Sequence, residues 1–331
     1  MKVLELKGNC CRDVAAETAE VISKGGVAIV PTDTLYGLVC DGLNSPAKEK
    51  IFRIKGRSCE KPLIGFVDTV EKVEKFAHIP PNVMPVLLKS WPGAATFIFK
   101  GKSSLPGMTS GRGAIAFRIP RHDLISGITR NFEIIASTSA NFSGMKNASS
   151  VKDMPEELKK MSDIIVCGGR TDGKPSSIWD ATEENLKLLR GTVLFVCEGN
   201  TCRSPMAEFM LRDFLKNSNL QVKTESAGIG ISGYGCASPN TCEAMEEAGM
   251  NLKGFISRSL TDTMVKNSDL IFVMEESQRG RILFRDPGAE DKITVLNVKD
   301  PAGGNLKAYR ETRDILRDII KKTVLTRICL N

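Results

Sequence analysis

The chain has 331 residues, of which 41% are hydrophobic and 6% aromatic, and its net charge is +7. This length favours two domains, and the composition suits an α/β protein with an aliphatic core. No apolar run approaches the roughly 18–20 residues of a membrane span, and the N-terminus lacks the apolar segment of a secretory signal, so we expect no membrane association and a cytoplasmic protein.

The charge is unevenly distributed along the chain. Residues 1–190 carry +6 and residues 191–331 carry +1. A basic first part fits an anionic partner such as a nucleotide or RNA, although ordinary solubility would explain the same charge. The ten cysteines are scattered and should be mostly reduced thiols. With two histidines and no CxxC pair, we expect no zinc site.

Short apolar runs alternate with helical patterns, as α/β folds require. The first run reads as a strand that ends at Pro31, and residues 45–55 read as a helix. Ser45 is the expected N-cap, Pro46 suits the first turn, and Gly56 can end the helix. Further strands are predicted at Leu63–Val67, Ala95–Phe99, Ala114–Ile119, Glu133–Ser137 and Asp163–Cys167.

The second part begins with a predicted strand at Thr192–Val196, followed by a helix with an apolar stripe. Two more strands are predicted within residues 268–274 and 293–298, and a last helix within residues 305–322. The domain boundary is expected near Arg190, giving domains of residues 1–190 and 191–331 that abut without a flexible linker.

The turn after Thr192–Val196 carries the most specific motif. Five residues separate Cys197 from Arg203 in the segment CEGNTCR. A strand-to-helix turn of this length can point its backbone N–H groups inward and form a cradle for a tetrahedral oxyanion. Gly199 and Asn200 tolerate the left-handed backbone that this needs. Arg203 offers a planar fork for two phosphate oxygens.

The same surroundings are expected to activate the cysteine. Inward N–H groups, the helix dipole and Arg203 favour thiolate over thiol, and cysteines in such positions reach a pKa of about 3.5–7.5. Cys197 is therefore the predicted nucleophile, and Ser204 can donate a hydrogen bond to its sulfur. Asp300, in the segment VKDPAGGN after a predicted strand, is the expected acid for the leaving group.

The segments VLFVCEGNTCRSPMAEFML and DPAGGNLKAYRETRDIL resemble the low-molecular-weight protein-tyrosine-phosphatase family, over about residues 192–325. The resemblance implies a small doubly wound parallel sheet, a phosphocysteine intermediate and no cofactor. It implies Cys197 as nucleophile, Arg203 as phosphate clamp, Ser204 as thiolate stabiliser and Asp300 as general acid. The rest of the phosphate loop would be Glu198, Gly199, Asn200, Thr201 and Cys202.

The resemblance also implies a reversible Cys197–Cys202 disulfide as oxidative protection; a small core residue is the other interpretation of Cys202. Thr201 occupies a position that is often apolar in tyrosine phosphatases and looks like the protein-arginine-phosphatase branch. Ala302 stands where the family usually carries an aromatic ring. Phosphoarginine and phosphotyrosine proteins both remain candidate substrates. An arsenate-reductase variant would need redox cysteines later in the chain than Cys236 and Cys242.

Three segments in the first part point to an anionic ligand: PTDTLYGL, KGRSCEKPL and STSANFSG. Lys55, Arg57 and Lys61 place three cations within seven residues, which would suit a triphosphate or form a solvated basic loop. Ser139 and Asn141 follow an apolar strand and suit contacts to a phosphate or a base edge. Arg118 would need an anion if its side chain points inward. Ser177 lies in the segment CGGRTDGKPSSIWD, which begins at the end of another predicted strand and contains several glycines.

Together these segments resemble the YrdC-like family of threonylcarbamoyl-AMP synthases, over roughly residues 10–190, through KGR at 55–57 and SAN at 139–141. The resemblance implies a twisted open α/β sheet with a basic concave cavity. It implies that L-threonine, bicarbonate and ATP are joined into threonylcarbamoyl-adenylate, with Mg²⁺ accompanying the pyrophosphate. The product would serve modification of adenosine 37 in tRNA, so tRNA or tRNA-modifying proteins are expected partners.

Every partner in this reaction is anionic, so catalysis would be largely positioning and charge neutralisation. Phe66 and Pro175 stand where many members carry a histidine and an acidic residue. A second hypothesis therefore makes residues 1–190 a nucleotide- or RNA-binding module that controls the phosphatase. The implied nucleotide- and substrate-binding set is Thr32, Thr34, Lys55, Arg57, Lys61, Arg118, Ser139, Asn141, Ser177 and Arg190.

Overall fold

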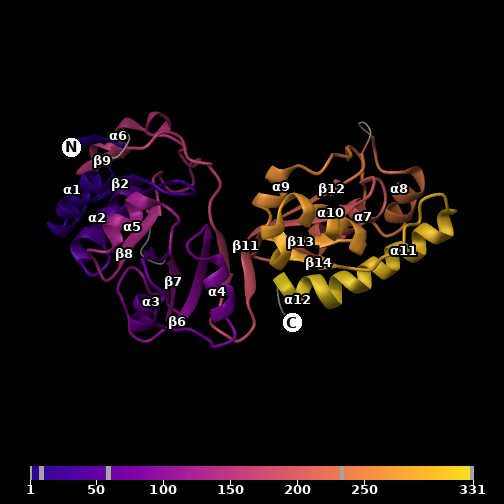
Figure 1. The fold of residues 1–331 in the computed structure, drawn as a ribbon, viewed down its shortest axis with the longest axis horizontal. Coiled ribbons are helices and arrows are strands. Elements are labelled where there is room, and N and C mark those ends of the chain that lie inside the picture. The colour runs from indigo at the N-terminus through magenta and orange to yellow at the C-terminus, as the bar shows by residue number, and fades with distance from the viewer. Residues whose placement is uncertain (1, 7–10, 57–60, 232–234, 329–331) are drawn as a thin grey trace. The chain divides into compact units, whose positions relative to one another are not determined.

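The computed structural model describes residues 2–6, 11–56, 61–231 and 235–328 (Figure 1). The chain divides into two units, Met1–Leu186 and Lys187–Asn331. Among the helices of the described residues, none combines the length and apolar character that a bilayer-spanning segment needs.

The first unit is a mixed sheet with helices. Its strands are β1 Lys2–Glu5, β2 Ala28–Pro31, β3 Tyr36–Asp41, β4 Ile64–Phe66, β5 Ala77–His78, β6 Ala95–Gly101, β7 Ala114–Arg118, β8 Ile135–Ser139, β9 Ile164–Cys167 and β10 Ser177–Asp180. Its α-helices are α1 Cys11–Ser23, α2 Ser45–Lys55, α3 Val70–Phe76, α4 Met84–Ser90, α5 Asp123–Thr129 and α6 Glu156–Lys160.

The strands of this unit follow the order β1-β9-β2-β3-β8-β4-β7-β6-β10, with β5 on β6. The sheet mixes parallel and antiparallel pairs: β9 is parallel to both β1 and β2, whereas β3 runs antiparallel to both β2 and β8. Alternate residues of β2 enter two different apolar clusters, Ile29 on one side and Ala28 and Val30 on the other. Because successive side chains of a strand point to opposite faces, the sheet is covered on both faces.

Helix α2 shows where the sequence prediction holds and where it shifts. The helix spans the predicted residues, and Gly56 ends it with a left-handed φ of 57°. Ser45, however, is not the N-cap: Asn44 Oδ1 accepts a hydrogen bond from Ala47 N at 3.0 Å. Asparagine and serine cap helices about equally well, so only the tertiary structure could choose between the two neighbours.

The second unit contains a smaller sheet. Its strands are β11 Lys187–Cys197, β12 Gln221–Gly228, β13 Leu270–Val273 and β14 Ile293–Val295. Its helices are α7 Arg203–Leu215, α8 Pro239–Glu246, α9 Asp262–Asn267, α10 Glu276–Arg285, α11 Leu306–Ile319 and α12 Leu325–Ile328, with a π-helical segment at Ile320–Val324. Helix α11 is the long yellow helix of this unit in Figure 1.

All strand pairs of the second sheet are parallel, in the order β12-β11-β13-β14. The first strand of the unit, β11, therefore has one neighbour on each side. In doubly wound sheets ligands bind where the strand order reverses, at the carboxyl end of such a strand. That end of β11 is Cys197, whose Cα pairs with Gly228 of β12. The predicted doubly wound parallel sheet is confirmed.

The predicted strands are present in both units, with ends shifted by one to a few residues. Strands β1, β3, β5, β10 and β12 are not predicted. In β12, the segment QVKTESAG has few apolar residues, and it becomes a strand because eight consecutive pairs, from Arg190↔Gln221 to Cys197↔Gly228, join it to β11. Pairing with a buried neighbour outweighs the weak intrinsic β preference of these residues.

Candidate active sites

The sulfur of Cys197 lies inside the loop that leads from β11 into α7. The backbone N–H of Asn200 donates to Cys197 Sγ at 3.2 Å, and Ser204 Oγ lies 2.9 Å from the same sulfur. Asn200 adopts a left-handed φ of 51°, which turns the loop back towards the strand end. The residues predicted around the sulfur are therefore brought together, and Cys197 itself is 3% exposed.

Arg203, the first residue of α7, is a buried cation with protein acceptors. Its Nη1 contacts the Glu275 carboxylate and donates to Val298 O at 3.0 Å, and its Nη2 contacts the Asp300 carboxylate. Its Nε is buried without a hydrogen-bond partner among the described residues. The structure thus brings Asp300 to Arg203. Glu275 is a residue that the sequence analysis missed, since the sequence marks it only as a residue before a helix.

The expected low pKa of Cys197 is wrong for this arrangement. Burial raises the pKa of the Cys197 thiol; the Ser204 hydroxyl, the Ser204 and Asn200 N–H groups and the Arg203 charge act in the opposite direction without cancelling it. The main cause is burial, because the sulfur has almost no contact with solvent and the charged thiolate loses its hydration. Glu275 and Asp300 both contact the guanidinium, so its opposing charge is partly neutralised. The sequence motif identified Arg203 but did not indicate that Glu275 would contact it.

Asp300 lies on the loop after β14, with its side chain partly exposed. Its second oxygen, Oδ1, accepts a hydrogen bond from Ala302 N at 3.1 Å. Ala302 is exposed, and its methyl group provides no aromatic wall beside the carboxylate. The acid candidate is therefore oriented by its own loop as well as by Arg203.

The sulfur of Cys202 has different partners from the sulfur of Cys197. Its Sγ lies 3.7 Å from Tyr309 Oη, 3.6 Å from Ser238 Oγ and 3.5 Å from Thr201 Oγ1. Both Cys197 and Cys202 are free thiols in this structure. The hydroxyl contacts fit a packed interior residue, and the reversible disulfide stays a prediction.

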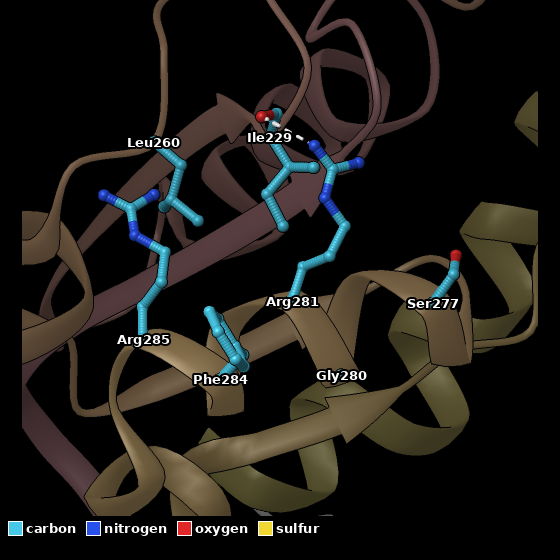
Figure 2. A pocket seen from close by; sticks show the side chains of 7 residues that line it. All are labelled: Ile229, Leu260, Ser277, Gly280, Arg281, Phe284 and Arg285. Carbon is cyan, nitrogen blue, oxygen red and sulfur yellow. Dashed lines mark hydrogen bonds between the residues drawn. The ribbon is translucent and has the colours of Figure 1, made fainter.

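The second loop residue, Glu198, connects the loop to α10. Arg281 Nη1 donates to both Glu198 oxygens, at 2.9 and 3.0 Å, and Arg281 Nη2 donates to Ile229 O at 3.1 Å. A Cβ on Gly230 would lie 2.1 Å from Glu198 Oε1, so a larger residue there would require the Glu198 side chain to shift. Figure 2 shows Arg281 at a pocket of about 470 Å³, lined by Ile229, Leu260, Ser277, Gly280, Arg281, Phe284 and Arg285.

In the first unit, the structure brings together three residues of the predicted set. Lys55 Nζ donates to Ser139 O and to Asn141 Oδ1, both at 2.7 Å, and lies 3.4 Å from Ser139 Oγ. Lys55 is 4% exposed. Ser139 ends β8 and pairs with Gly37 of β3, so this cluster flanks the first residues of β3. The cluster joins the KGR and SAN segments that carry the family resemblance.

Thr32, Thr34 and Arg118 form a second cluster, beside the turn before β3. Thr32 Oγ1 donates to Leu35 O at 2.6 Å and lies 3.0 Å from Thr34 Oγ1. Arg118 donates to Thr34 Oγ1 at 2.9 Å and to Asp33 Oδ1 at 2.5 Å. The anion that an inward Arg118 requires is therefore supplied by Asp33, which the sequence analysis missed. Arg118 fixes the threonine turn in this structure and does not present a free guanidinium for a nucleotide.

The remaining residues of the predicted set are Lys61, Ser177, Arg190 and Arg57. Lys61 is exposed. Ser177 Oγ lies 3.5 Å from Ala94 O and accepts a hydrogen bond from Trp179 Nε1 at 3.2 Å. Arg190 belongs to the second unit, on β11, where its Cα pairs with Gln221. Arg57 falls outside the described residues.

Comparison with known proteins assigns a family to each part. Residues 20–192 match the Sua5, YciO and YrdC family model, described as "Telomere recombination", and residues 192–328 match the low molecular weight phosphotyrosine protein phosphatase model. A protein-arginine-phosphatase of Bacillus subtilis is 33% identical over 139 residues, 39% of this chain and 92% of the relative. A putative threonylcarbamoyl-AMP synthase of Methanocaldococcus jannaschii is 31% identical over 197 residues, 59% of this chain and 93% of the relative.

Among solved structures, a variant of Pyrococcus abyssi Sua5 aligns with a TM-score of 0.53 at 20% identity, covering 68% of this chain and 91% of that one. At this identity the alignment shows a shared fold. The family matches and the relatives show that the chain belongs to the Sua5/YciO/YrdC family in its first part and to the low-molecular-weight protein phosphatase family in its second.

Proposed function

We propose that the second unit is a cysteine-dependent protein phosphatase whose nucleophile is Cys197. The observation that supports this most is the placement of Arg203 between the cysteine loop and Asp300, with its Nε buried and unpartnered among the described residues. A buried donor without an acceptor is costly, and a phosphoryl group in the loop would supply one. The guanidinium fork would then bind phosphate oxygens in place of the two carboxylates.

Displacement of Asp300 from Arg203 by the phosphoryl group would free it for proton transfer. The Cys197 thiolate attacks phosphorus, the bond from phosphorus to the leaving group breaks, and Asp300 in its protonated form gives the leaving group its proton. Water then attacks the phosphocysteine, Asp300 takes a proton from that water, and inorganic phosphate and the thiolate are released. The Ser204 hydroxyl, 2.9 Å from the sulfur, stabilises the thiolate as it leaves.

For the substrate we propose protein phosphoarginine ahead of phosphotyrosine. Thr201 places a hydroxyl in the loop, 3.5 Å from Cys202 Sγ, and a hydroxyl can accept a hydrogen bond from a guanidinium nitrogen. Ala302 provides no ring for stacking a phenol. The name of the Bacillus subtilis relative supports the same choice.

We propose further that the first unit forms threonylcarbamoyl-AMP from L-threonine, bicarbonate and ATP. The buried Lys55, held between Ser139 and Asn141, is the cation best placed to meet a carbamate or a phosphate. Arg118 would act indirectly, by holding the turn that carries Thr32 and Thr34, which we propose to line the site for threonine. The described residues contain no group of three or more His, Cys, Asp or Glu side chains suited to a metal, so Mg²⁺ would enter bound to the nucleotide phosphates.

Substrates with different leaving groups distinguish the role of Cys197 as nucleophile from the role of Asp300 as acid. Cys197→Ser should abolish p-nitrophenyl phosphate hydrolysis. Asp300→Ala should slow phosphopeptide hydrolysis by about 100-fold, within the usual range for a general acid, and should slow activated aryl phosphates less, because a good leaving group needs little protonation. Rates are measured across aryl phosphates of graded leaving-group pKa. An equal loss for good and poor leaving groups would exclude Asp300 as the acid.

The substrate proposal is tested at Thr201. The unmodified chain should release phosphate faster from phosphoarginine peptides than from phosphotyrosine peptides of the same sequence. Thr201→Ile should reverse the order, since it removes the hydroxyl, and Thr201→Ser should keep it. Equal rates on both peptides in the unmodified chain would overturn this assignment without affecting the nucleophile.

The raised pKa of the Cys197 thiol predicts how alkylation depends on pH. A raised pKa means that thiolate appears only as the pH rises through it, so iodoacetamide inactivation should accelerate above neutral pH. Glu275→Gln should move this profile to lower pH, because Arg203 then keeps more of its charge for the sulfur. The neighbouring exposed Glu276→Gln is the control and should leave the profile in place. A shift to higher pH in Glu275→Gln would contradict the counter-charge explanation.

For the first unit, Lys55→Met keeps the apolar stem and removes the charge. Pyrophosphate release from ATP with threonine and bicarbonate should fall by about 100-fold, since electrostatic positioning supplies most of the catalysis. The exposed Lys152→Met should have no effect. If the unmodified chain binds ATP but releases no pyrophosphate, the unit is a nucleotide-binding module, which is the second hypothesis for residues 1–190.

A further inference from the structure

Glu208 is a buried acid on α7 that the reaction outlined above does not use. It is 4% exposed, and Ser226 Oγ donates to its Oε2 at 2.6 Å. Its other oxygen, Oε1, contacts Arg212. A buried carboxylate is costly unless hydrogen bonds and a counter-charge satisfy it. Glu208 has both, so the fold keeps a charged group buried next to the residues that hold the cysteine loop.

A chain of hydrogen bonds runs from Glu208 to the loop. Ser226, on β12, is fully buried, and its Oγ lies 2.9 Å from Asn200 Nδ2. A carboxylate can only accept, so the Ser226 hydroxyl proton points to Glu208. Ser226 Oγ must then accept from Asn200, whose NH₂ group is donor-only. Glu208 therefore fixes the direction of this part of the chain.

The hydrogen-bond chain continues from Asn200 through Ser204 to Cys197. The second hydrogen of Asn200 Nδ2 is donated to Ser204 Oγ at 2.9 Å. Because Ser204 accepts there, its own proton is free for Cys197 Sγ, 2.9 Å away. Asn200 also donates its backbone N–H to that sulfur at 3.2 Å. Two of the donors that stabilise the thiolate thus depend on how the Asn200 amide is held.

Two anchors hold that amide. Arg258 N donates to Asn200 Oδ1 at 3.0 Å, and Ser226 receives Nδ2. Without an acceptor at Glu208, the buried Ser226 hydroxyl would have to donate elsewhere. If the Asn200 amide turned over to accept that proton, Oδ1 would replace Nδ2 beside both serine hydroxyls. Ser204 could then donate to Asn200 in place of the sulfur.

We propose that Glu208 is a positioning residue that sets the direction of the Ser226–Asn200–Ser204 hydrogen-bond chain, so that the Ser204 hydroxyl donates to Cys197. This proposal rests on the phosphatase function proposed above. Glu208 acts through three other side chains and touches no reacting atom. Its effect should therefore fall on the thiolate, and hence on kcat, and leave the binding of phosphate nearly unchanged.

The test compares Glu208→Gln with the unmodified full-length chain. Glutamine keeps the size, but its oxygen is drawn to Arg212 and its NH₂ then faces Ser226, donor against donor. The pH profile of iodoacetamide alkylation of Cys197 should move up by about one pH unit, the scale of one lost hydrogen bond. For p-nitrophenyl phosphate, kcat should fall about tenfold, with competitive inhibition by inorganic phosphate unchanged. Glu247→Gln, an exposed glutamate paired with Arg310, is the matched control and should change neither quantity.

A double variant distinguishes positioning from simple loss of stability. Ser226→Ala should shift the profile as Glu208→Gln does, and adding Glu208→Gln to Ser226→Ala should shift it no further, because the chain is already broken. Additive shifts, or an unchanged profile in folded Glu208→Gln, would overturn the proposal. Should Glu208→Gln fail to fold, an unchanged profile in Ser226→Ala would overturn it, and a shifted one would support it. Alkylation needs no substrate, so a chain that shifts as expected but releases no phosphate would refute the phosphatase function alone.

Discussion

A buried guanidinium needs negative charge around it, and Arg203 is 2% exposed. Without an anion in the loop, Glu275 and Asp300 supply that charge, and they also reduce what Arg203 can do for the Cys197 thiolate. Arg203, Glu275 and Asp300 therefore form the arrangement of the site in this structure, and an anion that binds Arg203 would displace the two carboxylates. In the proposed reaction, a phosphoryl group bound by Arg203 would free Asp300 when the leaving group needs a proton.

The fold holds the cysteine loop in a defined position. Strand β11 lies between two parallel neighbours, so the end at Cys197 is fixed on both sides. Asn200 then turns the loop with a left-handed backbone, and its fully buried side chain joins β12, α7 and the segment at Arg258. Because the loop is held by hydrogen bonds from several elements, its inward N–H does not depend on the ligand being present.

Much of both sites could be predicted from the sequence, because their motifs are local. The loop from Cys197 to Arg203 and the segments around Lys55 and Ser139 are short, and their spacing determines which groups converge. What the sequence could not show are the partners contributed by distant segments. Glu275 lies 72 positions from Arg203, and Asp33 lies 85 from Arg118. Each carboxylate changes the interpretation of an arginine. Glu275 neutralises part of the charge with which Arg203 would favour the thiolate, and Asp33 pairs with Arg118, which was expected to bind a nucleotide.

The account depends on Cys197 becoming covalently phosphorylated, and trapping of the intermediate tests that most directly. The full-length chain is mixed with a phosphorylated peptide, quenched in acid within the first turnover, digested and mapped by mass spectrometry under conditions that preserve thiophosphate esters. We expect a single phosphoryl group on the peptide that contains Cys197, and more of it in Asp300→Ala, where water attacks the intermediate without a base. Phosphate release with the phosphoryl group on another residue, or with no phosphorylated enzyme in either chain, would contradict the account.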